Sequence, residues 1–253
     1  GDPRDLHSFP TRRSSDLCMG SDPRFPHFPR FPCVVLAAGS ASRMGRQKLL
    51  LPLDGQPMAR KTIITLGKAF SPLVAVLGSD AALVEAALDG IPGLLIARNA
   101  AWEGGMLGSY QTGLKALESF LVGRGPRGSG GEGSPGGCFV HHADMPFVNP
   151  AILASLCLAA AEDQDSILFP RYAGTPPGPD AGEEGRLGHP VYVPWRLVPD
   201  ILALGKGCRA KDFLAAGPYR VLDTLDRAIL DDIDTPQAYA ALCRAYGCEG
   251  EYE

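Results

Sequence analysis

The sequence predicts an α/β protein with a three-layer, mostly parallel and doubly wound sheet of the Rossmann-like type. Two observations support this prediction. From Cys33 onward short apolar runs alternate with helix-like segments, and polar or glycine-rich residues follow the ends of several runs. A short, continuous apolar run is typical of a strand that is buried on both faces, as in a parallel sheet. Ligands of such sheets bind outside the carboxyl ends of the strands.

Strands and helices are expected to alternate through the first two thirds of the chain. The expected strands are Cys33–Ala38, Leu73–Leu77, Leu94–Ala97, Cys138–His142 and Ser166–Phe169. The expected helices between them are Pro57–Ala69, Ala81–Leu88, Leu107–Leu121 and Pro150–Ala161. Proline is favoured in the first helical turn and asparagine just before it, which indicates a helix start at Pro150 behind Asn149.

The last third of the chain continues this alternation without an internal repeat. We expect an apolar segment Val191–Trp195, helices near Arg196–Leu204 and Ala210–Ala215, strands at Tyr219–Leu222 and Ala228–Leu230, and a final helix Pro236–Tyr246. With no domain-length linker, residues 33–248 are expected to form a single domain.

Three stretches do not fit the alternation. Residues 1–32 are rich in proline and sustain no apolar period, which predicts a disordered tail or a remnant foreign to the fold. Gly123–Gly137 consists mostly of small, polar and charged residues and is expected to be a flexible surface insertion. Ala173–Leu187 has a similar composition and is expected to be either an insertion or a lid.

Composition and charge exclude several classes of protein. A net charge of −4 argues against a protein that coats nucleic acid, so any phosphate recognition is local. No apolar run reaches the roughly 18 residues that cross a bilayer, and no secretory signal opens the sequence. The seven cysteines are scattered and form no C-x-x-C pair, which is typical of reduced thiols. We therefore expect a cytoplasmic protein without nucleic-acid or membrane partners.

The first strand ends in a turn suited to anions. After Val34–Leu36 come Ala37, Ala38 and Gly39, which let a ligand approach the backbone, and then the cations Arg43, Arg46 and Lys48. The turn is not a Walker A motif, because Gly45 is not followed by Lys and Ser or Thr, and it lacks the G-x-G-x-x-G dinucleotide fingerprint. It therefore predicts a different kind of phosphate-binding loop.

Two acidic positions are candidate partners for this loop. Asp144 follows the strand Cys138–His142, where it is either a cap or a metal ligand. Asp232 and Asp234 precede the helix that starts at Pro236, where acidic residues complement the helix dipole. Of His141 and His142, alternation allows only one to face the ligand edge, and both are expected to be packed or solvated.

The motif Leu-Ala-Ala-Gly-x-x-x-Arg-Met-Gly-x-x-Lys-Leu-Leu, at residues 36–50, closely resembles the signature of the MobA-like NTP transferases. Asp144-Met145-Pro146 and Asp232-Ile233-Asp234-Thr235-Pro236 resemble later motifs of that family, in the same order. The resemblance covers roughly residues 33–242 and implies a nucleotidyltransferase fold. The Ala-Ala-Gly opening and the Lys-Leu-Leu-Leu-Pro ending are most similar to the molybdenum cofactor cytidylyltransferases.

This resemblance implies a set of site residues. Arg43, Lys48 and Asp144 would be catalytic, and Mg²⁺, with Mn²⁺ as an alternative, would bind Asp144 and Asp234, or Asp232 in place of Asp234. His189, in a Gly-His-Pro motif, would border the acceptor. The Gly207–Ala210 segment matches a later element loosely, and Lys206 stands where the family often has Asp. The nucleotide would contact Leu36, Ala37, Ala38, Gly39, Arg43, Gly45, Lys48, Gly78, Asn99 and Ser109.

The implied reaction transfers a nucleoside monophosphate from an NTP to a phosphorylated acceptor and releases pyrophosphate. CTP is favoured because guanylyl-transferring relatives tend to have glycine in place of Ala38. A molybdopterin-type acceptor is implied, together with a molybdoenzyme that receives the product. Two alternatives stay open: transfer to a phosphosugar or another phosphorylated acceptor, and a non-catalytic protein that delivers molybdenum cofactor.

Overall fold

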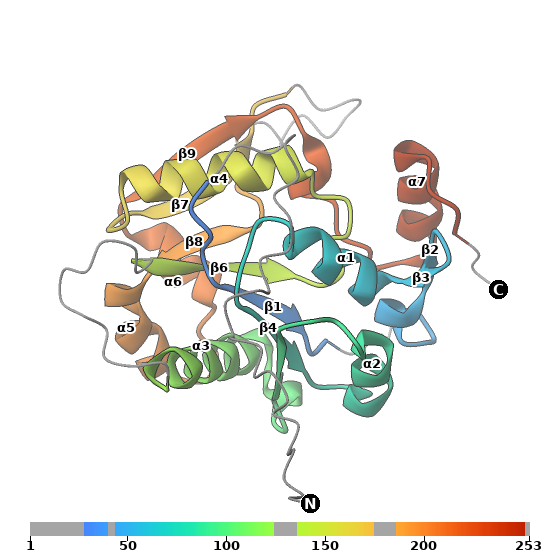
Figure 1. Ribbon diagram of the computed structural model, residues 1–253, viewed down its shortest axis with the longest axis horizontal. Coiled ribbons are helices and arrows are strands. Elements are labelled where there is room, and N and C mark those ends of the chain that lie inside the picture. The colour runs from blue at the N-terminus through green and yellow to red at the C-terminus, as the bar shows by residue number, and fades with distance from the viewer. Residues whose placement is uncertain (1–27, 40–43, 124–135, 175–185, 251–253) are drawn as a thin grey trace, which may run out of the picture.

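The computed structural model describes residues 28–39, 44–123, 136–174 and 186–250, and Figure 1 shows a central sheet with helices on both sides. Seven strands form this sheet in the order β5–β4–β1–β6–β8–β7–β9. Neighbouring strands are parallel except at β8, which runs antiparallel to β6 and β7. The predicted three-layer, mostly parallel α/β fold is therefore confirmed. The strands are β1 (Cys33–Ala37), β4 (Leu73–Leu77), β5 (Leu94–Arg98), β6 (Gly137–His142), β7 (Ile167–Tyr172), β8 (Val191–Pro194) and β9 (Tyr219–Thr224).

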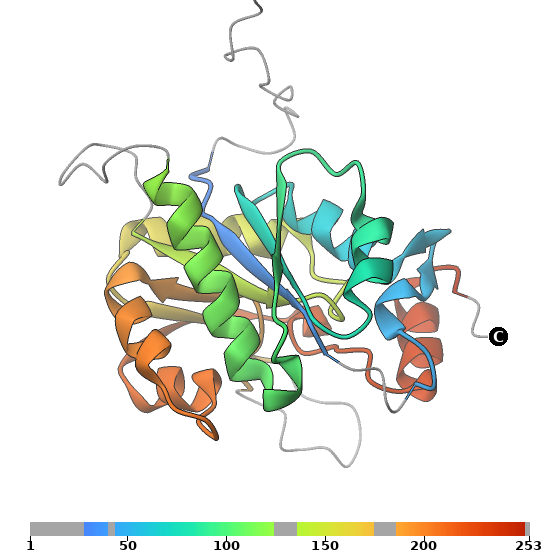
Figure 2. The same ribbon diagram turned by 90° about the horizontal axis from the view of Figure 1, so that it is seen from below.

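Alternating residues of β1 divide the interior into two hydrophobic cores, because successive strand side chains point to opposite faces. Cys33, Val35 and Ala37 belong to the core that includes residues of α1 (Met58–Leu66), α2 (Ala81–Leu88), α4 (Pro150–Glu162) and α7 (Pro236–Tyr246). Val34 and Leu36 belong to the other core, with residues of α3 (Met106–Val122), α5 (Val198–Ala203) and α6 (Ala210–Ala216). Figure 2 shows α3, α5 and α6 together on one face of the sheet.

Most predicted elements are confirmed, and β4, α2 and α7 have the predicted bounds. The strand expected at Ala228–Leu230 is wrong. That segment forms the 3₁₀ helix η4 (Arg227–Ile229), because the Asp226 carboxylate accepts a hydrogen bond from the Ala228 amide at 3.0 Å. A short hairpin of β2 (Pro52–Leu53) and β3 (Gln56–Pro57) was not predicted, and it delays the start of α1 to Met58.

The fold begins earlier than the predicted boundary at residue 33. Phe31 is 1% exposed and its ring packs edge-on against Phe139 and Tyr192, with centroid distances of 5.8 and 5.4 Å. The boundary was placed too late because a single aromatic residue among prolines gives no periodic signal. The rest of the predicted tail, residues 1–27, lies outside the described residues.

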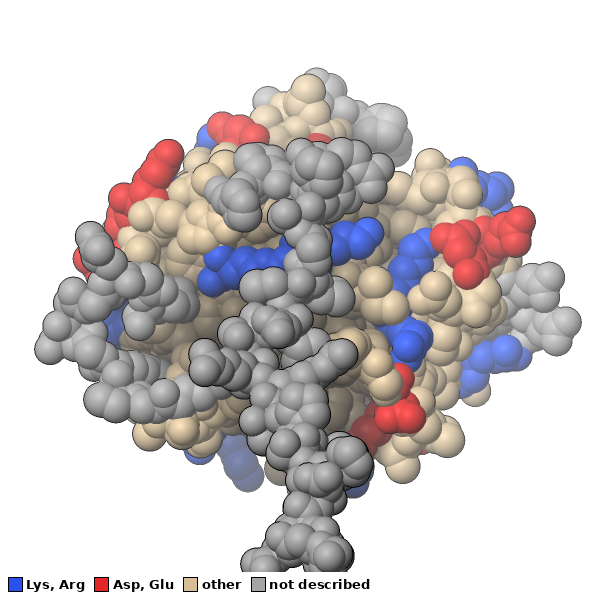
Figure 3. All heavy atoms as spheres, viewed as in Figure 1, with Lys and Arg blue, Asp and Glu red and all other residues tan. Residues whose placement is uncertain are grey.

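The predicted insertions fall mainly outside the described residues, at 124–135 and 175–185, but their ends are visible. Gly137 already belongs to β6. The Tyr172 amide donates to the Arg186 carbonyl at 3.0 Å, so the two ends of the second segment lie side by side. No helix in the described part of the chain has the length and apolar character needed to span a membrane. In Figure 3 the described Lys and Arg side chains are interspersed with acidic and neutral ones.

Candidate active site

A cavity of about 500 Å³ lies at the carboxyl ends of β1 and β6, beside the start of α3. This is the edge at which ligands of doubly wound sheets bind. Its walls come from the turn after β1, the residues after β6, the segment before α7 and the approach to α3. The lining residues are Leu36, Ala37, Ala38, Gly39, Met44, Lys48, Leu49, Trp102, Glu103, Gly105, Met106, Ser109, His142, Asp144, Asp232 and Asp234.

Lys48 connects two of these walls through a pair of short ionic contacts. Its Nζ lies 2.6 Å from Asp144 Oδ2 and 2.5 Å from Asp234 Oδ1. The carboxylates are neighbours because the Ile233 amide donates to the Asp144 carbonyl at 3.0 Å. Residues distant in sequence therefore meet in one cluster, which we call the Lys48–Asp144–Asp234 cluster.

Local structure holds each member of this cluster in place. Lys48 begins the 3₁₀ helix η1 (Lys48–Leu50), and the Gln47 side chain before it accepts from the Leu49 amide and donates to the Ser79 carbonyl at 3.3 Å. Thr62 Oγ1 of α1 lies 2.8 Å from the Ala143 carbonyl, next to Asp144. The cluster is therefore supported by α1 and by the segment just before α2, and not only by its own ion pairs.

Burial and charge act in opposite directions on Lys48. Burial alone lowers its pKa, but Asp144 and then Asp234 outweigh this effect and raise it above the ordinary lysine value. For Asp144, burial raises the pKa, while Lys48 more than compensates and the net pKa is lowered. Both groups are therefore charged at neutral pH.

Asp232 behaves differently from Asp144. Burial raises its pKa, and the negative charges of Asp234 and Asp144 raise it further. Among the described residues that line the first cavity, four are acidic (Glu103, Asp144, Asp232 and Asp234) and one, Lys48, is cationic. Such an excess of negative charge favours the binding of a cation.

The residues present suit a hard divalent cation. Asp144 Oδ1 is buried and accepts no hydrogen bond, which leaves a carboxylate oxygen available as a ligand. Across the described ranges no three His, Cys, Asp or Glu side chains are grouped as a metal site. Mg²⁺ is commonly held by one or two carboxylates plus substrate phosphates, so this sparse oxygen set fits Mg²⁺ or Mn²⁺ together with a nucleotide.

Part of the predicted nucleotide-binding loop lies among the described residues. Leu36, Ala37, Ala38 and Gly39 all line the cavity. Gly45 has a φ of +67°, a conformation that favours glycine, and it shapes the turn without lining the cavity. Arg43 lies outside the described residues, so its contact with phosphate stays a prediction.

Gly78 and Asn99 act from behind the cavity wall. A Cβ atom at Gly78 would lie 2.6 Å from both the Ala38 carbonyl oxygen and Trp102 Cβ, so only glycine fits where these segments cross. Asn99 Nδ2 donates to Ser109 Oγ at 3.0 Å, and Ser109 lines the cavity. Direct nucleotide contacts of Gly78 and Asn99 therefore stay predictions, whereas their packing around the wall is evident.

A second, larger cavity of about 930 Å³ adjoins the first. The two share a wall made of Glu103, Gly105, Met106, His142 and Asp232. Four cationic side chains line only the second cavity: Arg186, Lys206, Arg209 and Lys211. Apolar residues, among them Met145, Phe169, Leu187, Leu214 and Ile229, supply part of its lining.

His142 and His189 meet at this shared wall. Their ring centroids are 4.3 Å apart, and both residues line the second cavity. Burial lowers the pKa of each, Asp144 partly opposes this at His142, and the charge of Lys211 adds to the lowering at both. His141 instead points into the protein, with Nε2 3.1 Å from the Met145 carbonyl oxygen. Only His142 of the two therefore lines the cavities, and its ring packs against His189, so a role for it beyond packing stays a prediction.

The model of the MobA-like NTP transferase domain family matches residues 33–224. The chain belongs to this family. Among curated proteins it is 21% identical over 214 residues to the molybdenum cofactor cytidylyltransferase of Escherichia coli K12, covering 85% of this chain and 96% of that protein.

Solved structures agree with the nucleotidyltransferase fold. Rv0371c of Mycobacterium tuberculosis H37Rv matches with a TM-score of 0.63 and 24% identity, over 85% of this chain and 98% of that one. The same protein has also been solved in complex with manganese. The 4-diphosphocytidyl-2C-methyl-D-erythritol synthase of Anaerococcus prevotii matches with a TM-score of 0.60 and 14% identity, over 86% and 98% of the two chains.

The sequence missed several residues that line the cavities of this MobA-like transferase. Trp102 and Glu103 lie in the 3₁₀ helix η2 (Trp102–Gly104), inside a segment already singled out for Asn99 and Ser109. Asp232, named only as an alternative to Asp234, lines both cavities. Lys211 was missed, and Lys206 was named only as a departure from the family pattern, although cations around Gly207 were a usable signal for an anion site.

Proposed function

We propose that this MobA-like transferase moves CMP from CTP to a molybdopterin-type acceptor and releases pyrophosphate, with Mg²⁺ or Mn²⁺. The observation that carries the proposal is the Lys48–Asp144–Asp234 cluster, which lies in a cavity that shares a wall with a second, basic cavity. The first cavity has the groups to bind a metal and a triphosphate. The second has room and charge for a phosphorylated acceptor.

The first cavity provides the nucleotide side of the reaction. Ala38 and Gly39 give the phosphates a close approach to the backbone, and Lys48 and Arg43 bind and orient the β- and γ-phosphates. A metal held by Asp144 and Asp234 supplies charge neutralisation at the phosphates. The preference for CTP rests on Ala38 and on the similarity to the Escherichia coli cytidylyltransferase.

The second cavity provides the acceptor side. Among the described residues, its four cations line only this cavity, whereas the acidic Glu103 and Asp232 lie on the wall shared with the first. Charge is therefore separated, and the part of the cavity away from the nucleotide favours an anionic acceptor. The apolar lining from Phe169 and Leu187 suits a ring, as a pterin has.

The chemistry needs orientation more than proton transfer. An oxygen of the acceptor phosphate forms a bond to the α-phosphorus, the bond to the bridging oxygen of pyrophosphate breaks, and pyrophosphate leaves with the electron pair. The acceptor phosphate is already anionic, so no general base is required. Lys48 stabilises the charge that develops on the leaving group. The lowered pKa values of His142 and His189 keep both rings neutral at the shared wall, where they can donate hydrogen bonds to the acceptor.

Pyrophosphate release tests this proposal directly. The full chain is incubated with CTP, GTP, ATP or UTP, with Mg²⁺ or Mn²⁺, and with molybdopterin released from a molybdoenzyme or with a sugar phosphate. We expect release with CTP and molybdopterin, and none when EDTA is added. Release only with a sugar phosphate would support the phosphosugar alternative, and molybdopterin binding without any pyrophosphate would support a delivery protein.

A further inference from the structure

The Lys48 ammonium lies between the two carboxylates to which a metal is assigned above. Nζ is 2.6 Å from Asp144 Oδ2 and 2.5 Å from Asp234 Oδ1, and the Lys48 side chain is 10% exposed. These are the short distances of charge-assisted hydrogen bonds. Lys48 therefore already serves as the counter-ion of both carboxylates, which is a different role from the phosphate contact predicted for it.

A divalent metal on the same carboxylates must come close to this ammonium. Mg²⁺ lies about 2.0–2.1 Å from its oxygen ligands. With Nζ in direct contact with one oxygen of each carboxylate, a dication on the same oxygens and the ammonium would repel each other strongly in a poorly solvated place. Of the other oxygens of these two carboxylates, Asp144 Oδ1 is buried and accepts no hydrogen bond, but it belongs to a carboxylate that Lys48 already holds.

The protein alone offers few further ligands to offset this repulsion. No group of three potential ligands is arranged for a metal anywhere in the described ranges. A triphosphate changes the balance in two ways, because it supplies oxygen ligands for the metal and negative charge for Lys48. Lys48 can then leave the carboxylates for the phosphates while the metal takes its place.

We propose that Lys48 excludes free divalent metal from Asp144 and Asp234, so that the metal enters this site only together with the nucleotide. The inference rests on the proposed function in one respect, namely that an NTP is the substrate. In this proposal the Lys48 ammonium leaves the carboxylates of Asp144 and Asp234 and binds the phosphates when the metal–nucleotide complex binds, so that the site selects the complex over free metal. Replacing Lys48 should therefore strengthen the binding of metal alone and weaken the binding of nucleotide.

The exclusion of free metal by Lys48 is tested by titrating the full chain with Mn²⁺ alone and measuring the free ion by electron paramagnetic resonance. Lys48→Met keeps the length of the side chain and removes its charge, and we expect its Kd for Mn²⁺ to fall about tenfold or more below that of wild type. Lys48→Met/Asp144→Asn should lose this gain. Lys61→Met is the matched control, because Lys61 pairs with Asp54 away from both cavities, and its Kd should equal that of wild type.

Equal Mn²⁺ affinity of wild type and Lys48→Met would overturn the inference. If Lys48→Met does not fold, the Mn²⁺ affinity of wild type with and without nucleotide tests the inference. Its Kd for Mn²⁺ should fall at least about tenfold when a non-hydrolysable CTP analogue is added. No change on that addition, while the analogue is bound, would also reject the inference. The Mn²⁺ titrations without nucleotide need neither CTP nor acceptor. A failed turnover assay would therefore reject the proposed function, whereas the Kd values of wild type and Lys48→Met for Mn²⁺ would still test the inference about Lys48.

Discussion

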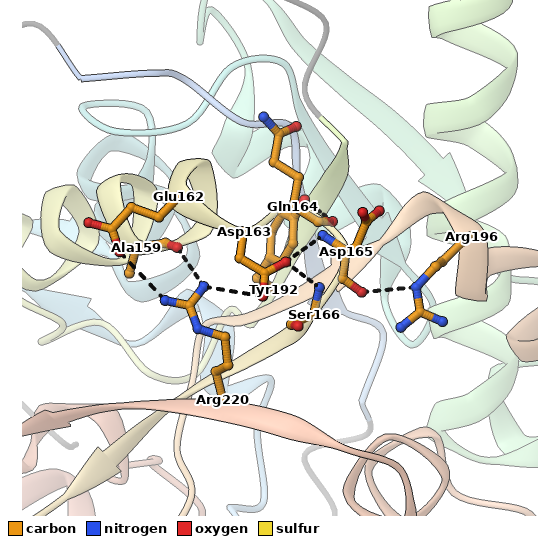
Figure 4. A network of polar contacts seen from close by, with 9 residues as sticks. All are labelled: Ala159, Glu162, Asp163, Gln164, Asp165, Ser166, Tyr192, Arg196 and Arg220. Carbon is orange, nitrogen blue, oxygen red and sulfur yellow. Dashed lines mark hydrogen bonds and ion pairs between the residues drawn. The ribbon is translucent and has the colours of Figure 1, made fainter.

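The two edges of the sheet use polar residues in opposite ways. At the amino end of β7 a network of hydrogen bonds and ion pairs joins the end of α4 and the turn after it to Tyr192, Arg196 and Arg220, as Figure 4 shows. The Asp163 carboxylate accepts from the amides of Asp165 and Ser166 at 3.0 and 3.2 Å, and Tyr192 donates to the Gln164 carbonyl at 3.1 Å. Arg220 and Arg196 donate to carbonyls of the same region.

The carboxyl edge keeps buried polar atoms without partners. In the described part of the chain three such side-chain atoms occur, Tyr110 Oη, His141 Nδ1 and Asp144 Oδ1. Tyr110 and Asp144 line the cavities, and His141 is the second-last residue of β6, three residues before Asp144. Unsatisfied buried groups cost stability, so their location here indicates that this edge is arranged for a ligand rather than for the fold.

The largest expected effect is on turnover, and it distinguishes a substitution at the carboxyl edge from one at the amino edge. Asp144→Asn keeps the size of the side chain but removes its charge, and we expect turnover to fall by about 100-fold or more while the protein stays folded. Asp163→Asn at the opposite edge should leave turnover unchanged. Pyrophosphate release and circular dichroism of both variants measure this, and near-normal release by Asp144→Asn would remove it from the reaction.

The second effect concerns stability at the carboxyl edge and its dependence on pH. Burial lowers the pKa of His141 to about 4, from an ordinary value of 6.5 in the unfolded chain. The unfolded state therefore binds the proton first, so stability is full above pH 6.5 and is lost as pH falls toward 4. Between pH 7.5 and 5 this single group should cost about 2 kcal/mol.

Urea unfolding of wild type and His141→Gln at the two pH values measures this difference. The glutamine variant can still donate to the Met145 carbonyl but does not titrate, so its stability should change less between pH 7.5 and 5. Identical pH profiles for the two proteins would show that His141 is not the responsible group.

The third effect concerns the acceptor cavity. Lys206→Glu reverses a charge that lines only this cavity, and we expect the KM for the acceptor to rise about tenfold at low salt, with the KM for the nucleotide unchanged. Lys115→Glu makes the same change on the exposed side of α3 and serves as the control. Equal effects of both variants would mean that net charge, not the cavity, attracts the acceptor.

The smallest effect is at the amino edge. Tyr192→Phe removes the hydrogen bond to the Gln164 carbonyl and leaves the ring in the core, which should cost about 1 kcal/mol of unfolding free energy. Turnover at 25 °C should stay the same. A fall in turnover without a loss of stability would contradict the division of roles between the two edges.

The sequence predicted the layers well because each depends on local patterns. Continuous apolar runs identified the buried strands, and proline behind Asn149 identified the start of α4. The position of β8 between β6 and β7 could not be predicted, since strand order depends on contacts between distant residues. The strand predicted at Ala228–Leu230 was wrong because a side-chain hydrogen bond of Asp226 starts a 3₁₀ helix there, and apolar periodicity does not detect such a bond.

The candidate site was predicted in its members but not in its contacts. Lys48, Asp144 and Asp234 were singled out together because the motifs that contain them resemble those of the MobA-like family, and their roles stay predictions. Their ion pairs could not be foreseen, because they require the β1 turn, the β6 end and the approach to α7 to meet. The choice between His141 and His142 also needed the structure, since alternation permits either register.

The segment that includes α7 packs back onto the β2–β3 hairpin. Tyr239 of α7 donates to the Pro52 carbonyl, and the Asp54 amide donates to the Glu249 carbonyl at 2.8 Å, which ties the end of the chain to the hairpin beside η1 (Figure 1). A growing chain emerges from the ribosome in order, so Lys48 and Asp144 are made long before Asp234. A ribosome-bound polypeptide that does not yet include Asp234 can offer Lys48 only Asp144 of this pair, so the two-carboxylate pairing of Lys48 forms only after residue 234 has been made.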